Sequence, residues 1–167
     1  MKAIVCPKYG SYDVLQLKEV DSPVPKDNEV KVKIIAASIN ATDLEIVKGV
    51  VFVRLSGAFR KPSVKILGCD FSGRVESIGK NVTQFKQGDE VYADLMYQSP
   101  SYGALAEYVC IPEKSLRMKP IKMTFEEAAT IPQAGVLALQ GIKGKKIPES
   151  GQEVLINGAG GGVGTFA

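Results

Sequence analysis

Residues 29–34 read Glu-Val-Lys-Val-Lys-Ile, so charged and apolar side chains alternate along the chain. A strand with one wet face and one buried face has this two-residue period. Pro25 and the pair Asp27-Asn28 stand just before it and are typical of a turn. The pattern therefore predicts a strand over Glu29–Ser38 with one face in a core.

Short apolar runs lie on both sides of this strand, separated by Gly, Pro, Asn and Asp. That spacing is typical of a barrel or sandwich of short strands. The predicted strands are Lys2–Cys6, Leu15–Val20, Glu29–Ser38, Phe71–Ile78, Glu90–Ala93 and Ala104–Ile111. The fold class that follows is mainly β with short helices.

A first helix is expected at about Thr42–Lys48, with Asn40 or Thr42 as its N-cap and Gly49 as its stop. A second begins after Thr124, because a Thr followed three residues later by Glu127 makes a capping box.

Pro132 interrupts that second helix, and Gln133–Ile142 predicts a third.

The composition excludes several function classes. The chain has no histidine, so Ser-His-Asp and Cys-His hydrolase sites cannot be built from these residues. The net charge is only +3, and the Lys and Arg residues are scattered among acidic residues. This distribution disfavours nucleic-acid binding. Cys6, Cys69 and Cys110 are far apart and form no CxxC pair, which argues against a disulfide framework and a cysteine-built metal site.

The apolar runs are too short for export or membrane insertion. The N-terminus lacks the long apolar stretch of a signal peptide, and Val50–Leu55 is far shorter than a membrane span. We expect a cytoplasmic protein with no membrane partner.

A glycine-rich turn stands near the C-terminus. Glu153–Asn157 has the apolar look of a buried parallel strand and runs into Gly158-Ala159-Gly160-Gly161-Gly162-Val163-Gly164. Glycines three apart after a strand let backbone N–H groups approach a pyrophosphate, so these seven residues are the predicted cofactor-binding site. A plain flexible loop is the alternative, whereas a P-loop is set aside because the turn has no lysine.

Only Thr165, Phe166 and Ala167 follow this turn. A parallel strand needs sheet neighbours and a phosphate-binding turn needs a helix behind it. We therefore expect the N-terminal portion of a longer protein, with little affinity for NAD(P)H and no activity on its own.

Several segments together resemble the medium-chain dehydrogenase/reductase superfamily, specifically its zinc-free, quinone oxidoreductase-like branch. The segments are Ala37–Asp43, Gly68–Val75 continuing to Tyr92, Gly103–Tyr108, Ile131-Pro132 and Val154–Gly164. The likeness covers nearly the whole chain.

The resemblance implies a GroES-like β-barrel catalytic domain at residues 1–123, a helical connector at 124–150 and the truncated start of an α/β Rossmann domain at 151–167. It also implies an oxidoreductase that transfers hydride between NADPH or NADH and a small-molecule quinone, enone, carbonyl or alcohol. NADPH is the more expected cofactor, and a homodimer is compatible with the family. The exact substrate stays open.

The resemblance further implies that the zinc sites of related dehydrogenases are missing. Zinc-dependent relatives have Cys where this chain has Asn40, and Gly-His-Glu where it has Gly68-Cys69-Asp70. Between Val91 and Ala104 there is no four-cysteine lobe for a structural zinc.

Without a metal, hydrogen-bond donors must polarise the substrate carbonyl. Thr42 falls where zinc-dependent relatives place a proton-relay hydroxyl, and its alternative role is a helix N-cap. Asn40 would donate to substrate or nicotinamide, or stabilise a turn. Asp43 would orient nearby groups, or serve as a first-turn helix acid. These three residues are the predicted catalytic set.

The competing hypothesis is a non-enzymatic GroES-like interaction module. Such a module has no use for a phosphate-binding glycine turn, so Gly158–Gly164 favours the enzyme.

We predict that the purified protein binds no stoichiometric zinc, because Asn40 and Cys69 stand where zinc ligands would be needed. Elemental analysis after gel filtration should find well under one zinc per chain. One tightly held zinc would overturn the prediction.

Overall fold

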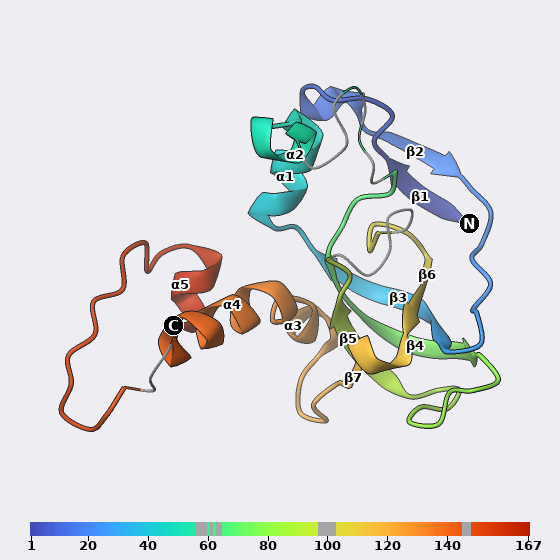
Figure 1. Cartoon of the computed structure of the whole chain (residues 1–167). Helices are drawn as coiled ribbons and strands as arrows, with labels where there is room; N and C mark the ends of the chain where they lie inside the picture. Colours follow the sequence, from blue (N-terminus) through green and yellow to red (C-terminus); the bar gives the residue numbers. More distant parts are fainter. Residues whose placement is uncertain (56–59, 61, 63–64, 97–102, 145–147) are drawn as a thin grey trace.

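A five-stranded antiparallel sheet forms the centre of the protein, in the order β6-β3-β4-β5-β7. The computed structural model describes residues 1–55, 60, 62, 65–96, 103–144 and 148–167. The strands of the sheet are β3 (Glu29–Ser38), β4 (Asp70–Ile78), β5 (Glu90–Asp94), β6 (Tyr108–Pro112) and β7 (Arg117–Met118). Figure 1 shows β3 and β4 running side by side through the middle of the domain.

A second, two-stranded sheet pairs β1 (Lys2–Val5) with β2 (Gln16–Glu19). Isolated bridges from Ala3 to Ala106 and from Val5 to Ile66 connect it to the rest of the domain. Within the described ranges no ladder joins β6 to β7, so backbone pairing does not close the sheet there. The predicted barrel is therefore observed as a sheet-rich domain in which isolated bridges connect the smaller sheet to segments next to the larger one.

The alternation along β3 explains the position of the core. Val30 and Val32 are fully buried, while Lys31 and Lys33, which alternate with them, are not. The two valines pack with Phe71 of β4 and other apolar side chains in the main core cluster. The predicted bounds of β3 are confirmed, since burial of one strand face fixes its register.

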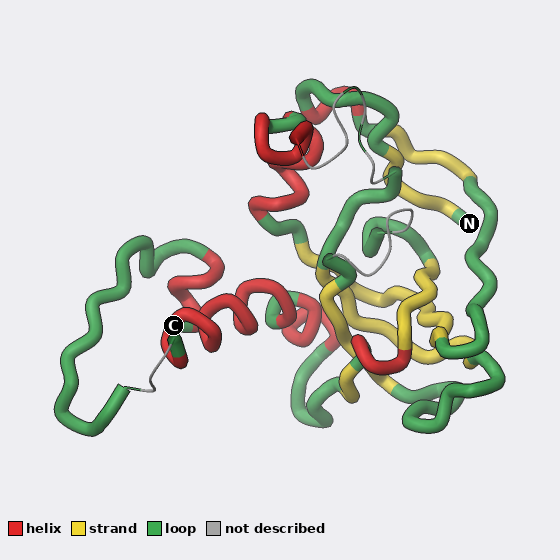
Figure 2. The backbone as a smooth tube through the Cα atoms, viewed as in Figure 1, coloured by secondary structure: helices red, strands yellow, loops and turns green. Residues whose placement is uncertain are grey.

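Helices contribute about as many residues as strands, which corrects the expectation of a mainly β chain (Figure 2). The α-helices are α1 (Ala41–Lys48), α2 (Val51–Leu55), α3 (Phe125–Ala129), α4 (Pro132–Lys143) and α5 (Gly162–Phe166), with 3₁₀ turns at Tyr12–Val14 and Glu113–Ser115. The structure is a mixed, sheet-rich fold. In the described part of the chain no helix is long and apolar enough to cross a membrane.

The helices after the sheet follow the predicted signals. Glu127 N donates to Thr124 Oγ1 and Thr124 N donates to the Glu127 carboxylate, so the capping box is confirmed. Pro132 separates α3 from α4 and occupies the first turn of α4. α3 packs on β3, β4 and β5, and α4 extends away from the sheet to contact α5 (Figure 1).

The predicted strand over Glu153–Asn157 is wrong. The segment has no strand pairing, and Leu155 and Val154 are 95% and 58% exposed. A parallel strand exists only beside sheet neighbours, and within residues 148–167 none is present.

A single short helical turn does follow the first glycines of the turn. α5 forms one short turn from Gly162 to Phe166, beginning before Thr165. It lies on the first part of α4, where Ala134 and Gly135 are small enough for close contact.

Phe71→Ala should lower the free energy of unfolding by about 3–5 kcal/mol, because the ring is fully buried in the main core cluster. Ile121→Ala is the control, since Ile121 is 98% exposed and its truncation should cost at most about 0.5 kcal/mol. Urea unfolding of the three proteins measures both. A loss below about 1 kcal/mol for Phe71→Ala would contradict the assigned core.

Candidate active site

The three predicted catalytic residues lie together where β3 passes into α1. Asn40 is the N-cap residue of α1, so Thr42 and Asp43 belong to the first turn of the helix. Asn40 N donates to Asp43 Oδ2 at 2.8 Å. The alternative role of Thr42 as N-cap is wrong, because that position belongs to Asn40.

Asp43 also reaches the segment before β4. Its Oδ1 accepts the Gly68 N–H at 3.1 Å and lies 3.6 Å from the Cys69 thiol, which donates to it. The side chain is 2% exposed. Asp43 is therefore both a first-turn helix acid and the group that joins α1 to residues 68–70.

Asp70 begins β4 and is completely buried. Its carboxylate accepts the Asn40 side-chain Nδ2 at 3.2 Å. It also accepts the backbone N–H of Gln133, at 3.0 Å to Oδ2 and 3.2 Å to Oδ1. Asp70 thereby ties the Asn40 turn to the start of α4.

Thr42 is connected to α4 as well. Its hydroxyl donates to the Gln133 side-chain oxygen across 3.4 Å, near the outer limit of a hydrogen bond. The residue is half-buried. The Thr42 oxygen is therefore held between α1 and α4.

The carboxyl groups of Asp43, Asp70 and Asp94 form an acidic cluster that is poorly solvated. Burial raises the pKa of Asp70 to about 6; the Gln133 N–H and Asn40 amide oppose this, and the nearby Asp94 and Asp43 carboxylates add to it. Burial also raises the pKa values of Asp43 and Asp94. Relative to water, the site therefore shifts these carboxyl groups toward their protonated forms.

The donor set fits zinc poorly. Burial raises the pKa of the Cys69 thiol, and the nearby Asp43 and Asp94 carboxylates raise it further, so the thiolate that zinc requires is disfavoured. Across the described residues no group of three His, Cys, Asp or Glu side chains is arranged to hold a metal ion.

The glycine turn leads into α5, which packs against the first part of α4 (Figure 1). Gly158 has a φ of 78°, and a Cβ on Gly164 would come within 2.4 Å of the Gly158 oxygen. The turn therefore requires glycine at both positions, and its exposed backbone leaves room for a phosphate to approach. The residues fit the predicted pyrophosphate role of Gly158–Gly164, which stays a prediction.

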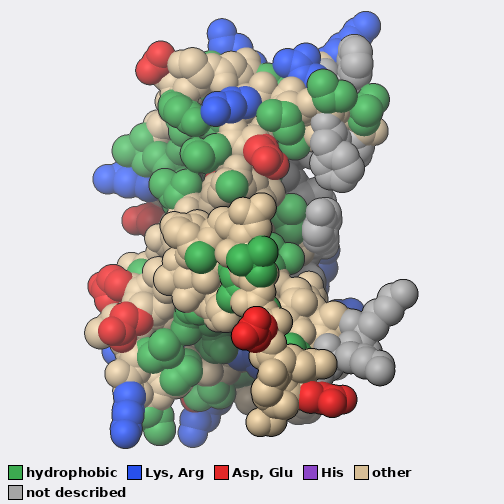
Figure 3. All heavy atoms as spheres, turned by 90° about the vertical axis from the view of Figure 1, so that its left-hand side faces the viewer, with side chains coloured by type: hydrophobic (Ala, Val, Ile, Leu, Met, Phe, Trp, Pro, Cys, Tyr) green, Lys and Arg blue, Asp and Glu red, His purple; other side chains and the backbone are tan. Residues whose placement is uncertain are grey.

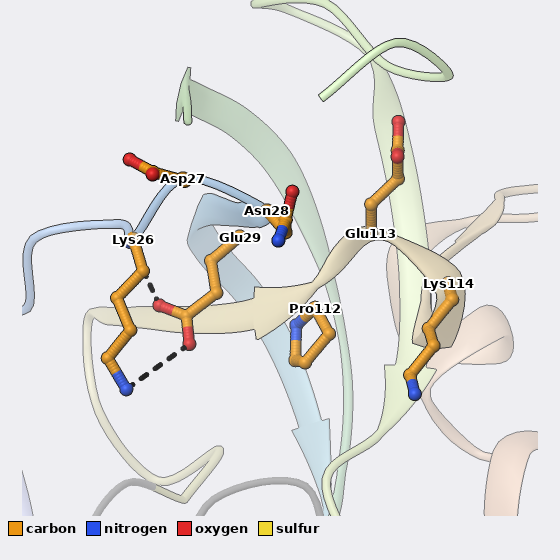
Figure 4. Close-up of a pocket in the computed structure, with 7 residues that line it drawn as sticks. All are labelled: Lys26, Asp27, Asn28, Glu29, Pro112, Glu113 and Lys114. Carbon is orange, nitrogen blue, oxygen red and sulfur yellow. Dashed lines mark hydrogen bonds and ion pairs between the residues drawn. The ribbon is translucent and has the colours of Figure 1, made fainter. Parts of the chain in front are cut away.

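A larger cavity lies elsewhere among the described residues. It measures about 810 Å³ and is lined by Lys26, Asp27, Asn28, Glu29, Pro112, Glu113 and Lys114 (Figure 4). Glu29 begins β3 whereas Asn40 follows its end, so this cavity is at the opposite end of the strand. The Glu29 carboxylate moreover accepts the Lys26 backbone N–H at 3.0 Å, and its other oxygen lies 3.8 Å from Lys26 Nζ.

A hollow of about 310 Å³ lies closer to the acidic cluster. Asp94 and Met96 of the β5 end line it together with Pro132 and Val136 of α4. The candidate site therefore lies beside this smaller hollow, next to α4 and the end of β5, and not beside the 810 Å³ cavity.

The apolar content of Val50–Phe59 would suit the lining of a substrate cleft, a packed loop or a subunit contact. Hydrophobic side chains gather over α1 and α2 on the upper part of the face in Figure 3, where Leu44, Val51 and Leu55 are exposed. Residues 56–59 lie outside the described residues, and the three alternatives stay open.

Sequence reasoning missed Gln133 as a site residue. It is a polar residue among the buried positions Pro132, Ala134 and Ala138 of α4 and is only 9% exposed. A lone polar side chain on an apolar helix face was the available signal.

Comparison with known proteins gives a consistent result. Residues 26–121 match the alcohol dehydrogenase GroES-like domain family. A 2-methylene-furan-3-one reductase of Solanum lycopersicum is 37% identical over 99% of this chain and 42% of its own length.

Two solved structures share the fold. The quinone oxidoreductase of Coxiella burnetii superposes with a TM-score of 0.87 at 34% identity, over 99% of this chain and 51% of that one. The Escherichia coli quinone oxidoreductase, solved with NADPH, gives 0.83 at 27% identity over 98% and 47%. The chain thus spans about half the length of these relatives.

Asp70 makes the stability of the protein depend on pH. Its pKa is raised from 3.8 to about 6, so the folded state holds this proton more tightly than the unfolded state. The stabilisation from that proton is complete below about pH 4 and is lost as pH rises through about 6. Asp70→Asn keeps a neutral group there at every pH.

We therefore predict that the stability of Asp70→Asn relative to the wild type increases by about 2 kcal/mol between pH 4.5 and 7. Urea unfolding across that range measures it, with Asp21→Asn, which removes an exposed carboxylate, as the charge-matched control. A relative stability that falls with rising pH would contradict the assigned environment of Asp70.

Proposed function

Because the chain belongs to the alcohol dehydrogenase GroES-like domain family, in the quinone oxidoreductase-like branch of the medium-chain dehydrogenase/reductase superfamily, we propose that it forms the substrate-side half of an NADPH-dependent reductase. The proposed substrates are small quinones and α,β-unsaturated carbonyl compounds. The similarity to the tomato 2-methylene-furan-3-one reductase and to the Coxiella quinone oxidoreductase supports this class.

One observation carries the proposal: Thr42 and Asn40 offer hydrogen-bonding groups at the end of β3, where buried carboxylates hold Asn40 and the Gln133 amide holds Thr42. Asn40 is fixed by Asp43 and Asp70, so its position does not depend on a bound ligand. Donors that are already in place stabilise developing negative charge without reorganising during the reaction.

Reduction of an enone or quinone requires a hydride and a proton. A bound reduced nicotinamide supplies the hydride. Thr42 is the group in this chain that handles the proton, because its hydroxyl is half-buried and is paired only weakly, across 3.4 Å, with Gln133. The Thr42 hydroxyl would give its proton to the substrate as the hydride arrives, and a proton from solvent would then restore the hydroxyl.

The cofactor would rest on Gly158–Gly164, whose backbone can approach a pyrophosphate. NADPH is preferred to NADH because the Escherichia coli relative was solved with NADPH. Asn40 would donate either to the nicotinamide amide or to the substrate oxygen.

The proposal is tested on the complete gene product, by following NADPH oxidation with an enone and a benzoquinone. Turnover with either class is expected, and turnover with neither would favour the interaction module. NADH in place of NADPH tests the cofactor preference.

Thr42→Val should lower kcat by about 100-fold and leave the Kd for NADPH unchanged, because the hydroxyl contributes to proton delivery and not to pyrophosphate contacts. Thr83→Val, which alters an exposed threonine, is the control and should retain full activity. An unchanged kcat in Thr42→Val would remove Thr42 from the catalytic set.

A further inference from the structure

Gln133 contacts both halves of the candidate site. Its backbone N–H donates to Asp70, and its side-chain oxygen accepts the Thr42 hydroxyl. The side chain is 9% exposed at the start of α4. A buried amide costs about 1–3 kcal/mol unless it is hydrogen-bonded, so its partner is part of the reason it can stay there.

The two contacts have different requirements. Any residue at position 133 except proline offers the backbone N–H that binds Asp70, so the tie between β4 and α4 does not need glutamine. The bond to Thr42 does need a polar side chain of this length. The side chain is therefore separable from the structural tie.

We propose that Gln133 is a positioning residue that sets the direction of the Thr42 hydroxyl. The inference rests on the proposed reductase function. In the observed arrangement the Thr42 proton points to the Gln133 oxygen and is not available to a substrate.

A primary amide can reverse this arrangement without moving its heavy atoms far. Turning the amide over presents its NH₂ group to the Thr42 oxygen, and the hydroxyl proton is then free to point toward substrate. The weak 3.4 Å bond makes the exchange inexpensive. Gln133 thus supports both the resting and the proton-donating directions.

Two substitutions separate these roles. Gln133→Met keeps the length and the backbone N–H but removes both the donor and the acceptor. Gln133→Glu keeps the acceptor at high pH but has no donor until its carboxyl is protonated. On the complete gene product, each should lower kcat about tenfold at pH 8, with little change in KM for the substrate.

The pH profile then distinguishes positioning from packing. A protonated carboxyl offers both a donor and an acceptor, and the amide does too. The kcat of Gln133→Glu relative to the wild type should therefore recover as pH falls from 8 to 5, whereas that of Gln133→Met should stay low. The neighbouring Asp70, Asp43 and Asp94 carboxylates favour protonation of the introduced carboxyl in this range.

A double substitution tests whether Gln133 acts through Thr42. In a Thr42→Val background, Gln133→Met should change kcat by less than twofold, because the hydroxyl it directs is gone. Independent, multiplying losses would overturn the proposal. A Gln133→Glu variant as active as the wild type at pH 8 would also overturn it.

Side-chain amide NMR of Gln133 in this chain gives a measurement that needs no activity. Thr42→Val should shift the Gln133 NH₂ resonances, and Thr83→Val should not. If the gene product reduces no enone or quinone, the reductase proposal fails, and this shift alone then decides whether Gln133 holds the Thr42 hydroxyl. No shift would overturn the positioning role.

Discussion

The rest of the site depends on the hydrogen bonds that the buried Asp70 carboxylate accepts. A carboxyl group taken wholly out of water is costly unless hydrogen-bond donors surround it, and here the donors come from Asn40 and from the Gln133 backbone. The turn before α1, the start of β4 and the start of α4 must therefore meet at one point. Asp43 adds a second tie, from α1 to Gly68. Because these contacts are internal, the site is in place before any substrate arrives.

Much of the fold could be predicted from local pattern. The alternation in β3 gave its bounds because Val30 and Val32 face a core and the lysines do not, and the Thr124–Glu127 box marked the start of α3 because capping is a contact within four residues. The strand predicted over Glu153–Asn157 failed for the opposite reason. An apolar run indicates that a segment could be buried, but burial also needs a sheet beside it, and none adjoins Leu155 in the described residues.

The site divides in the same way. Asn40, Thr42 and Asp43 came from a resemblance to a known family, and their grouping followed because they are neighbours in sequence. Gln133 lies 91 residues from Thr42, and their contact depends on how Asp70 anchors α4 to the sheet. No local pattern contains that information. The cap position likewise needed the structure, since both Asn40 and Thr42 are good N-cap residues.

Native-state amide exchange of Gln133 tests the central claim most directly, because its N–H is the donor that joins α4 to the buried Asp70 carboxylate. If this tie holds the site together, the Gln133 amide should exchange as slowly as the Val32 amide in the core. Both would then exchange only through opening that approaches global unfolding. Exchange as fast as that of the exposed Leu155 amide would show that α4 opens freely from the sheet, and would contradict the account.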